Sequence, residues 1–174
     1  MIELKEPRPP ASSEALAATE RRLAELGHRI PPSYRAFLAE QDGGRPVRNV
    51  FTFEQNDREQ SSRVAAFLGV EPAPDGDLAG VAGRVGDIPP GILPIAGDEF
   101  GNYVCLDTRE DRDGPVLFWD HEEGFDDDQV DFSNLHEIAP DLRHFLGGLT
   151  ERRARPLQPQ VEPTAQGWRR LFRR

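Results

Sequence analysis

The sequence has little of several residue types that common functional sites require. Among 174 residues there is one cysteine, Cys105, and one lysine, Lys5. A single cysteine excludes an internal disulfide and a cysteine-based zinc cluster, and it favours a reducing, cytoplasmic setting. The glycine-rich stretch at residues 80–86 resembles a phosphate-binding loop only superficially, because it lacks the lysine that such a loop needs. The histidines fall in no catalytic spacing and no G-x-S-x-G motif occurs, so we expect no catalytic residues, no cofactor and no metal.

Long apolar runs are also missing. The longest run has about five residues, far short of the roughly 20 that a membrane-spanning helix needs. The first 14 residues contain no apolar core of a signal peptide, so we expect no secretory signal. Charged residues make up 30% of the chain and hydrophobic residues 37%, with aromatic residues spread along it. This composition is typical of a soluble globular domain with long loops.

The net charge of -10 is distributed unevenly. Residues 1–150 carry 29 acidic and 14 basic residues, a net of -15, whereas residues 151–174 carry 2 acidic and 7 basic residues, a net of +5. An acidic body repels phosphate backbones and attracts basic proteins. We therefore expect no direct binding to nucleic acid by the body of the protein.

Two helices are predicted near the N-terminus. The segment EALAATERRLAEL repeats leucine at near-helical spacing, and it lies between Ser12–Ser13, a good N-cap, and Gly27, a typical C-terminal residue. Pro31 and Pro32 then interrupt the helix. The following segment SYRAFLAEQDGG predicts a second short helix that Gly43–Gly44 ends.

The middle of the chain gives weaker signals. NVFTF, residues 49–53, predicts a strand. SSRVAAFLGV, residues 61–70, predicts a brief helix with Val64, Phe67 and Leu68 on one side. Residues 71–91 predict a loop rich in proline, glycine and aspartate, with a short strand at about 78–85.

The most regular pattern follows. Strands are predicted at residues 92–95, 103–107 and 116–120, with another short strand around 129–132. The short polar turns between them favour antiparallel pairing, since parallel strands need long crossovers. After Pro140, which suits the first turn of a helix, Leu142, Phe145, Leu146 and Leu149 form the stripe of a helix packed on a sheet. The predicted class is α+β: an antiparallel meander with helices packed against it.

Four segments, taken in order, resemble one known family. They are IPPSYRAFLAEQDGG, ILPIAGDEFGNYVCLD, GPVLFWDHEE and FSNLHEIAPDLRHFLGGL. The pattern resembles the SUKH superfamily, in the group typified by the fungal cell-wall assembly regulator (Smi/Knr-type), over about residues 12–149. The resemblance implies a SUKH-like α+β domain at residues 1–150, followed by a Pro/Arg-rich tail at 151–174. It also implies a non-enzymatic binding role, since many bacterial members are immunity proteins that neutralise a cognate toxin of a polymorphic toxin system. It supplies no catalytic residues and no toxin-facing residues that transfer to this chain.

The stretch GDEFGN, residues 97–102, has two interpretations. Asp98 and Glu99 are adjacent carboxylates and Asp107 follows one strand later, so these three residues could form an acid/base or metal site. Neighbouring side chains on a strand point to opposite faces, however, and glycine with Asp or Asn is typical of a hairpin turn. The turn is therefore favoured. The alternative function left open is a divalent-metal-dependent hydrolase that uses Asp98, Glu99 and Asp107 together with the carboxylates of residues 121–128.

The stretch HEEGFDDD, residues 121–128, contains five carboxylates and one histidine around Phe125. Its spacing matches neither an EF-hand loop nor an H-E-x-x-H site, although an oxygen-rich loop can bind a hard cation. A solvated loop and an acidic surface that faces a protein partner are the other interpretations. Phe125 would then be an apolar anchor within a polar rim. The candidate partner-binding residues are Glu122, Glu123, Phe125, Asp126, Asp127 and Asp128.

Three further residues or clusters have ordinary structural interpretations. Cys105 lies inside a predicted strand, where a buried inert thiol is expected. Trp119 is expected to be a sheet aromatic, because no basic groove surrounds it. In the tail, Trp168, Leu171 and Phe172 form an apolar cluster among four arginines, which could dock on the domain, bind a partner or touch an anionic membrane.

The function expected from the sequence is that of a protein-binding module. Its most concrete form is an immunity protein for a cognate toxin, with a basic nuclease as the partner that the acidic body would attract. A weaker alternative is a regulatory scaffold that acts through the arginine-rich tail.

Overall fold

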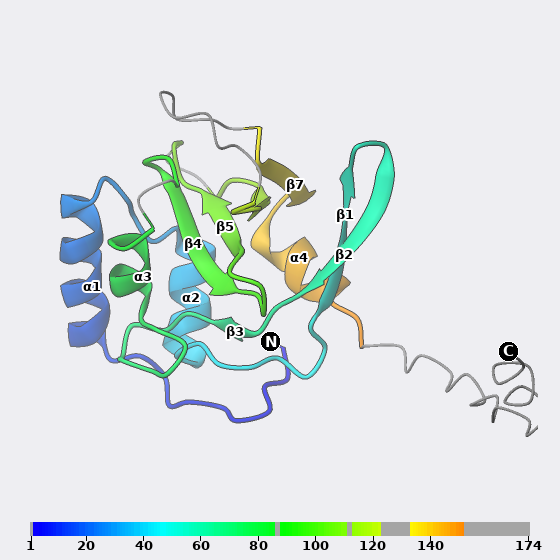
Figure 1. The fold of residues 1–174 in the computed structure, drawn as a ribbon. Coiled ribbons are helices and arrows are strands. Elements are labelled where there is room, and N and C mark those ends of the chain that lie inside the picture. Colours follow the sequence, from blue (N-terminus) through cyan, green and yellow to red (C-terminus); the bar gives the residue numbers. More distant parts are fainter. Residues whose placement is uncertain (1, 86–87, 111–112, 123–132, 152–174) are drawn as a thin grey trace, which may run out of the picture.

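The computed structural model describes residues 2–85, 88–110, 113–122 and 133–151. Within these ranges the chain forms four helices and two antiparallel sheets, one of two strands and one of five (Figure 1). The predicted α+β class is therefore confirmed. None of the helices in these ranges is long and apolar enough to cross a membrane.

The two N-terminal helices begin and end at the signals in the sequence. Helix α1, Ser13–Glu25, starts after Ser12, whose side chain accepts a hydrogen bond from the backbone N–H of Ala15 at 3.1 Å. Gly27 follows the helix with a φ of +78°, a conformation that glycine adopts without strain. Helix α2, Pro32–Glu40, has a proline in its first turn, where no N–H is needed. Both predicted helices are confirmed.

In the hairpin after α2, the first strand was predicted and the second was not. Strand β1, Val50–Gln55, pairs with β2, Arg58–Arg63, and the turn residues Asn56 and Asp57 both have positive φ. Such a two-residue turn matches the twist of the paired strands. The hairpin projects from one side of the molecule in Figure 1.

The helix predicted at residues 61–70 is wrong. Residues 61–63 belong to β2, and Ala66–Phe67 forms β3, which pairs with β4. A short apolar run is buried equally well as a strand or as a helix, and periodicity alone does not separate the two. Here the pairing of β3 with β4 decides in favour of the strand.

The strand predicted at residues 78–85 is also wrong. The segment forms a short helix, α3, Leu78–Ala82. Asp77 caps it by accepting a hydrogen bond from the N–H of Gly80 at 2.9 Å. This N-cap satisfies a helix donor and outweighs the low helix propensity of the glycines.

The larger sheet is an antiparallel meander in the order β3-β4-β5-β6-β7. Its main strands are β4, Ile92–Gly97, β5, Tyr103–Asp107, β6, Val116–Trp119, and β7, Leu135–Ala139. The strand expected around residues 129–132 lies outside the described residues, and β7 was not predicted. Helix α4, Leu142–Gly148, follows with Asp141 as its N-cap, so Pro140 precedes the cap instead of occupying the first turn.

The two faces of the sheet are buried in different ways. The main core packs all four helices and β1 against one face. On the other face, Ile92, Cys105, Leu117 and Trp119 form a smaller apolar cluster with Ile88. Cys105 and Trp119 are therefore buried sheet residues, as predicted. Burial also raises the pKa of the Cys105 thiol, which keeps it protonated and unreactive.

A buried histidine gives the fold a pH dependence. Burial lowers the pKa of His28 below its ordinary value of about 6.5, because the charged ring would lose its hydration. The unfolded chain therefore binds a proton more readily than the folded chain, and this group reduces stability as pH falls below about 6.5. We expect the difference in unfolding free energy between pH 7.5 and pH 5 to be smaller for His28→Leu than for the wild type. Urea titrations at the two pH values measure it, and an unchanged difference would show that His28 does not contribute.

Candidate functional site

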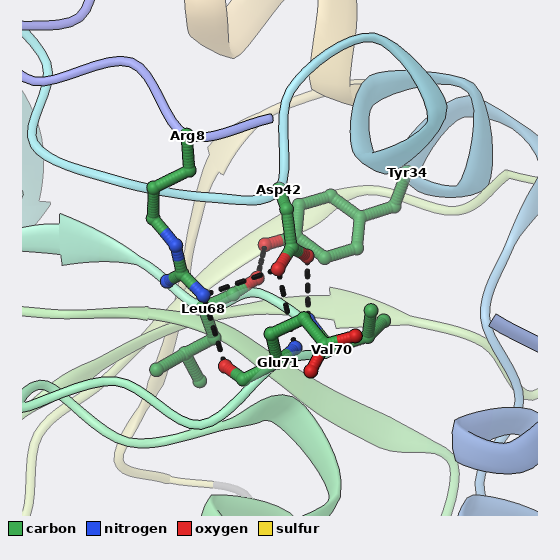
Figure 2. Close-up of polar contacts among 6 residues, drawn as sticks. All are labelled: Arg8, Tyr34, Asp42, Leu68, Val70 and Glu71. Carbon is green, nitrogen blue, oxygen red and sulfur yellow. Dashed lines mark hydrogen bonds and ion pairs between the residues drawn. The ribbon is translucent and has the colours of Figure 1, made fainter. Parts of the chain in front are cut away.

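A buried polar cluster surrounds Asp42, just after α2 (Figure 2). The Asp42 carboxylate is 2% exposed and accepts hydrogen bonds from the backbone N–H groups of Val70 at 2.6 Å and Glu71 at 3.1 Å. The Arg8 guanidinium donates at 3.1 Å to the same carboxylate oxygen that accepts from Glu71, and it also donates to the Glu71 carbonyl at 2.9 Å. One carboxylate thus connects the N-terminal segment, the end of α2 and the chain after β3.

Tyr34 of α2 makes a second connection to the same region. Its hydroxyl lies 2.6 Å from the carbonyl oxygen of Leu68 (Figure 2). It also lies 2.9 Å from the carbonyl oxygen of Ile95, so it links the residue after β3 to strand β4. The hydroxyl is buried and fully hydrogen-bonded, and burial raises the pKa of Tyr34.

Two glycines let the backbones approach closely around Asp42. A Cβ added at Gly69 would lie 2.6 Å from the Asp42 carbonyl oxygen. Gly43 has a φ of +70°, and a Cβ there would lie 2.5 Å from the Phe67 carbonyl oxygen. The segment from Tyr34 to Gly43 therefore carries a structural clamp, in which the Tyr34 hydroxyl and the Asp42 carboxylate are held by hydrogen bonds to backbone groups of the chain after β3.

The GDEFGN stretch is a turn whose centre is Asp98. The Asp98 carboxylate accepts hydrogen bonds from the N–H groups of Phe100 at 2.7 Å and Asn102 at 2.9 Å. It also accepts from the Asn102 amide at 2.9 Å and the Ser62 hydroxyl at 3.0 Å. Within the stretch, Gly101 has a positive φ of +98°. The Asp98 carboxylate therefore stabilises the turn, which is the interpretation that the sequence favoured.

The same turn presents an aromatic side chain to solvent. Phe100 is 67% exposed, and within the described residues it is the most exposed large hydrophobic side chain. Its neighbour Glu99 forms an exposed ion pair with Arg63 of β2. The hydrogen bonds to Asp98 hold the backbone beneath Phe100 in one conformation. An exposed apolar side chain on a fixed backbone is the kind of feature that protein partners use as an anchor.

The acidic stretch 121–128 begins beside this turn. The Asn102 side-chain oxygen accepts from the His121 backbone N–H at 3.1 Å and lies 2.6 Å from the His121 ring Nδ1. Glu122 follows and is exposed. We use the name hairpin-end surface for Arg63, Glu99, Phe100, His121 and Glu122. The other candidate residues, Glu123, Phe125, Asp126, Asp127 and Asp128, lie outside the described residues.

Three of the carboxylates proposed for a hydrolase, Asp98, Glu99 and Asp107, do not converge. Asp107 pairs with Ile92, at the far end of the β4–β5 hairpin from Asp98 and Glu99. The separation is about 15 Å, since each strand residue advances about 3.3 Å. A hydrogen bond from the Arg109 side chain lowers the pKa of Asp107, so this carboxylate is ion-paired. The grouping of Asp98, Glu99 and Asp107 in one site was wrong, because the register of the hairpin separates them.

Metal ligands do not gather anywhere in the part of the chain that the structure describes. No group of three His, Cys, Asp or Glu side chains in these ranges has the geometry to hold a metal ion. Near the hairpin end, the Asp98 carboxylate is used in the turn and the Glu99 carboxylate in an ion pair. What this surface offers chemically is an aromatic anchor with charged neighbours.

Sequence reasoning did not single out Phe100 or the contact between Asn102 and His121. The identity of a turn does not show which of its side chains points to solvent. Nor does it show which distant segment the turn contacts. The one signal in the sequence that could have identified this side chain is a phenylalanine, Phe100, in a turn otherwise made of glycine and polar residues.

The domain is a five-stranded antiparallel meander with helices and a hairpin on one face, and the most exposed large hydrophobic side chain of the described residues, Phe100, lies on the hairpin-end surface. Residues 10–148 match the model of the SMI1 / KNR4 family (SUKH-1). The match spans four-fifths of the 174 residues, and the chain belongs to this family. The resemblance found in the sequence is confirmed. A search of curated proteins gives no match to the chain.

Proposed function

We propose that this protein is an immunity protein that binds and neutralises a cognate protein toxin. Membership of the SMI1 / KNR4 family (SUKH-1) over residues 10–148 is the observation that carries the proposal. The family supports a toxin-immunity or Smi1/Knr4-type module, and the immunity role is the more specific of the two. A protein that acts by binding needs no catalytic group, and we propose a non-enzymatic role in the cytoplasm.

The hairpin-end surface is the proposed place of toxin binding. Phe100 is 67% exposed on a turn fixed by hydrogen bonds, so little conformational entropy is lost when a partner covers it. Glu99 and Glu122 are exposed beside it and would form part of a polar rim. We propose that Glu123, Phe125, Asp126, Asp127 and Asp128 also belong to this surface; the four acidic residues add negative charge and Phe125 adds an apolar side chain.

The charge of the body indicates the kind of toxin. Residues 1–150 have a net charge of -15, which accelerates encounters with a basic protein and disfavours encounters with phosphate backbones. A nuclease carries a basic surface for its own substrate, and an acidic immunity protein can cover that surface. We therefore propose a basic toxin, with a nuclease as the leading candidate.

The test is a binding measurement with the protein encoded by the neighbouring gene. We expect a complex that forms at a rate falling steeply with added salt, since charges are screened beyond about 10 Å at 0.1 M salt. Co-expression should also relieve the toxicity of that protein. If the neighbouring gene product neither binds nor is neutralised, the immunity proposal loses its support.

A further inference from the structure

A groove lies between α2 and α4, away from the residues that form the hairpin-end surface. Its volume is about 820 Å³. The apolar part of its lining is contributed by Ile2, Ala36, Phe37, Leu142, Leu146 and Leu149. Charged residues of both signs lie along it: Glu3, Glu40, Arg48 and Arg143. An apolar groove with a few polar groups fits an apolar peptide segment.

The chain leaves the domain at this groove. Leu149 lines it, and the next residue, Thr150, is fixed by backbone hydrogen bonds with β1. Thr150 donates to the carbonyl of Val50 at 2.9 Å, and its own carbonyl accepts from Val50 and Asn49 at 3.0 Å each. The first residue of the tail, Glu151, therefore starts next to the groove.

The tail has the composition of a suitable occupant. Residues 152–174 contain one close apolar cluster, Trp168, Leu171 and Phe172, at the spacing i, i+3 and i+4. This spacing places the three side chains on one side of a helical turn. The tail is basic and the body is acidic, so their charges are complementary.

We propose that Trp168, Leu171 and Phe172 dock into the groove between α2 and α4 of the same chain. The tail then covers the part of the groove wall that is accessible to solvent, where Ala36 is exposed and Ile2 and Leu146 are half-buried. This docking is independent of the immunity function, because it uses residues of neither the hairpin-end surface nor the acidic stretch.

The connection is long enough for the proposed docking. Seventeen positions separate Glu151 from Trp168. The root-mean-square span expected for a random-coil segment of that length is about 20–25 Å. Helix α2 has nine residues and is about 14 Å long, so the cluster can reach any part of the groove. A tether of this kind gives an effective concentration on the order of millimolar, at which even a weak apolar contact is populated.

The test compares hydrogen exchange in full-length proteins. The triple variant Trp168→Ser/Leu171→Ser/Phe172→Ser should exchange faster than the wild type in residues 32–40 and 142–149, by about tenfold if docking is favoured ten to one. The matched control Leu157→Ser/Val161→Ser removes the other two large apolar side chains of the tail and should leave exchange unchanged. Ala36→Arg, at an exposed position in the groove wall, should reproduce the effect of the triple variant on α4.

Three outcomes would overturn the proposal. Equal exchange in the triple variant and the wild type would show that the cluster does not cover the groove. An equal acceleration in the control would show a nonspecific effect of the tail. Loss of protection on dilution, with a matching change in sedimentation, would assign the groove to a second copy of the chain instead of the chain's own tail.

Discussion

Asp42→Ala should lower the free energy of unfolding by about 2–4 kcal/mol, because it removes a buried carboxylate that accepts two backbone hydrogen bonds and pairs with a partly exposed arginine. The carboxylate is 2% exposed and has three donors: the N–H groups of Val70 and Glu71, and Arg8. The alanine variant leaves the Val70 N–H buried without a partner and the Arg8 charge without its counter-ion. Urea unfolding of the wild type and the variant measures the loss.

Two control variants separate this effect from a general loss of charge. Asp75→Ala removes an exposed carboxylate that pairs with Arg45, and such pairs contribute about 0–1 kcal/mol. Asp42→Asn keeps one oxygen acceptor and removes the charge, so its loss should lie between the other two. A loss for Asp42→Ala no larger than that for Asp75→Ala would contradict the role assigned to the clamp.

Phe100→Ala should weaken binding to the cognate toxin by about 10- to 100-fold, which corresponds to about 1.4–2.8 kcal/mol. The side chain is 67% exposed in the free protein, so its removal should change the unfolding free energy little. The Kd measured by calorimetry with the neighbouring gene product tests the first statement, and urea unfolding tests the second.

Leu26→Ala is the matched control for Phe100→Ala. Leu26 follows α1 and, at 41% exposure, is the other large hydrophobic side chain that the described ranges leave exposed. Its removal should leave the Kd unchanged, because it is not a residue of the hairpin-end surface. If Phe100→Ala also binds as tightly as the wild type, the toxin binds elsewhere, although the immunity function itself could still hold.

The elements that the sequence predicted correctly carry their signals within a few residues. Helix α1 has its serine cap and its terminal glycine, and strands β4 to β6 are separated by short polar segments. Strand β2 was missed because four of its six residues are exposed and polar, so it lacks an apolar alternation. Residues 61–70 were misassigned because a short buried strand and a short buried helix have similar composition.

At the candidate site, the sequence predicted the features that depend on neighbouring residues and missed those that depend on distant ones. The turn role of Asp98 follows from hydrogen bonds that span two to four residues, and the sequence favoured it correctly. The exposure of Phe100 depends on packing around the turn. The contact between Asn102 and His121 joins residues 19 positions apart, which local patterns do not record.

The class, the family pattern, the turn at residues 97–102 and the acidic character of residues 1–150 could all be predicted from the sequence, because cap, turn and charge signals are local or additive. The tertiary structure alone decided that β3 is a strand, that Asp107 lies far from Asp98, and that the acidic stretch starts beside Phe100. It also explained the segment from Tyr34 to Gly43, whose polar groups bond to a backbone about 30 residues further along the chain. The physical reason is that strand register and buried hydrogen bonds are fixed between distant segments, and only the folded chain brings those segments together.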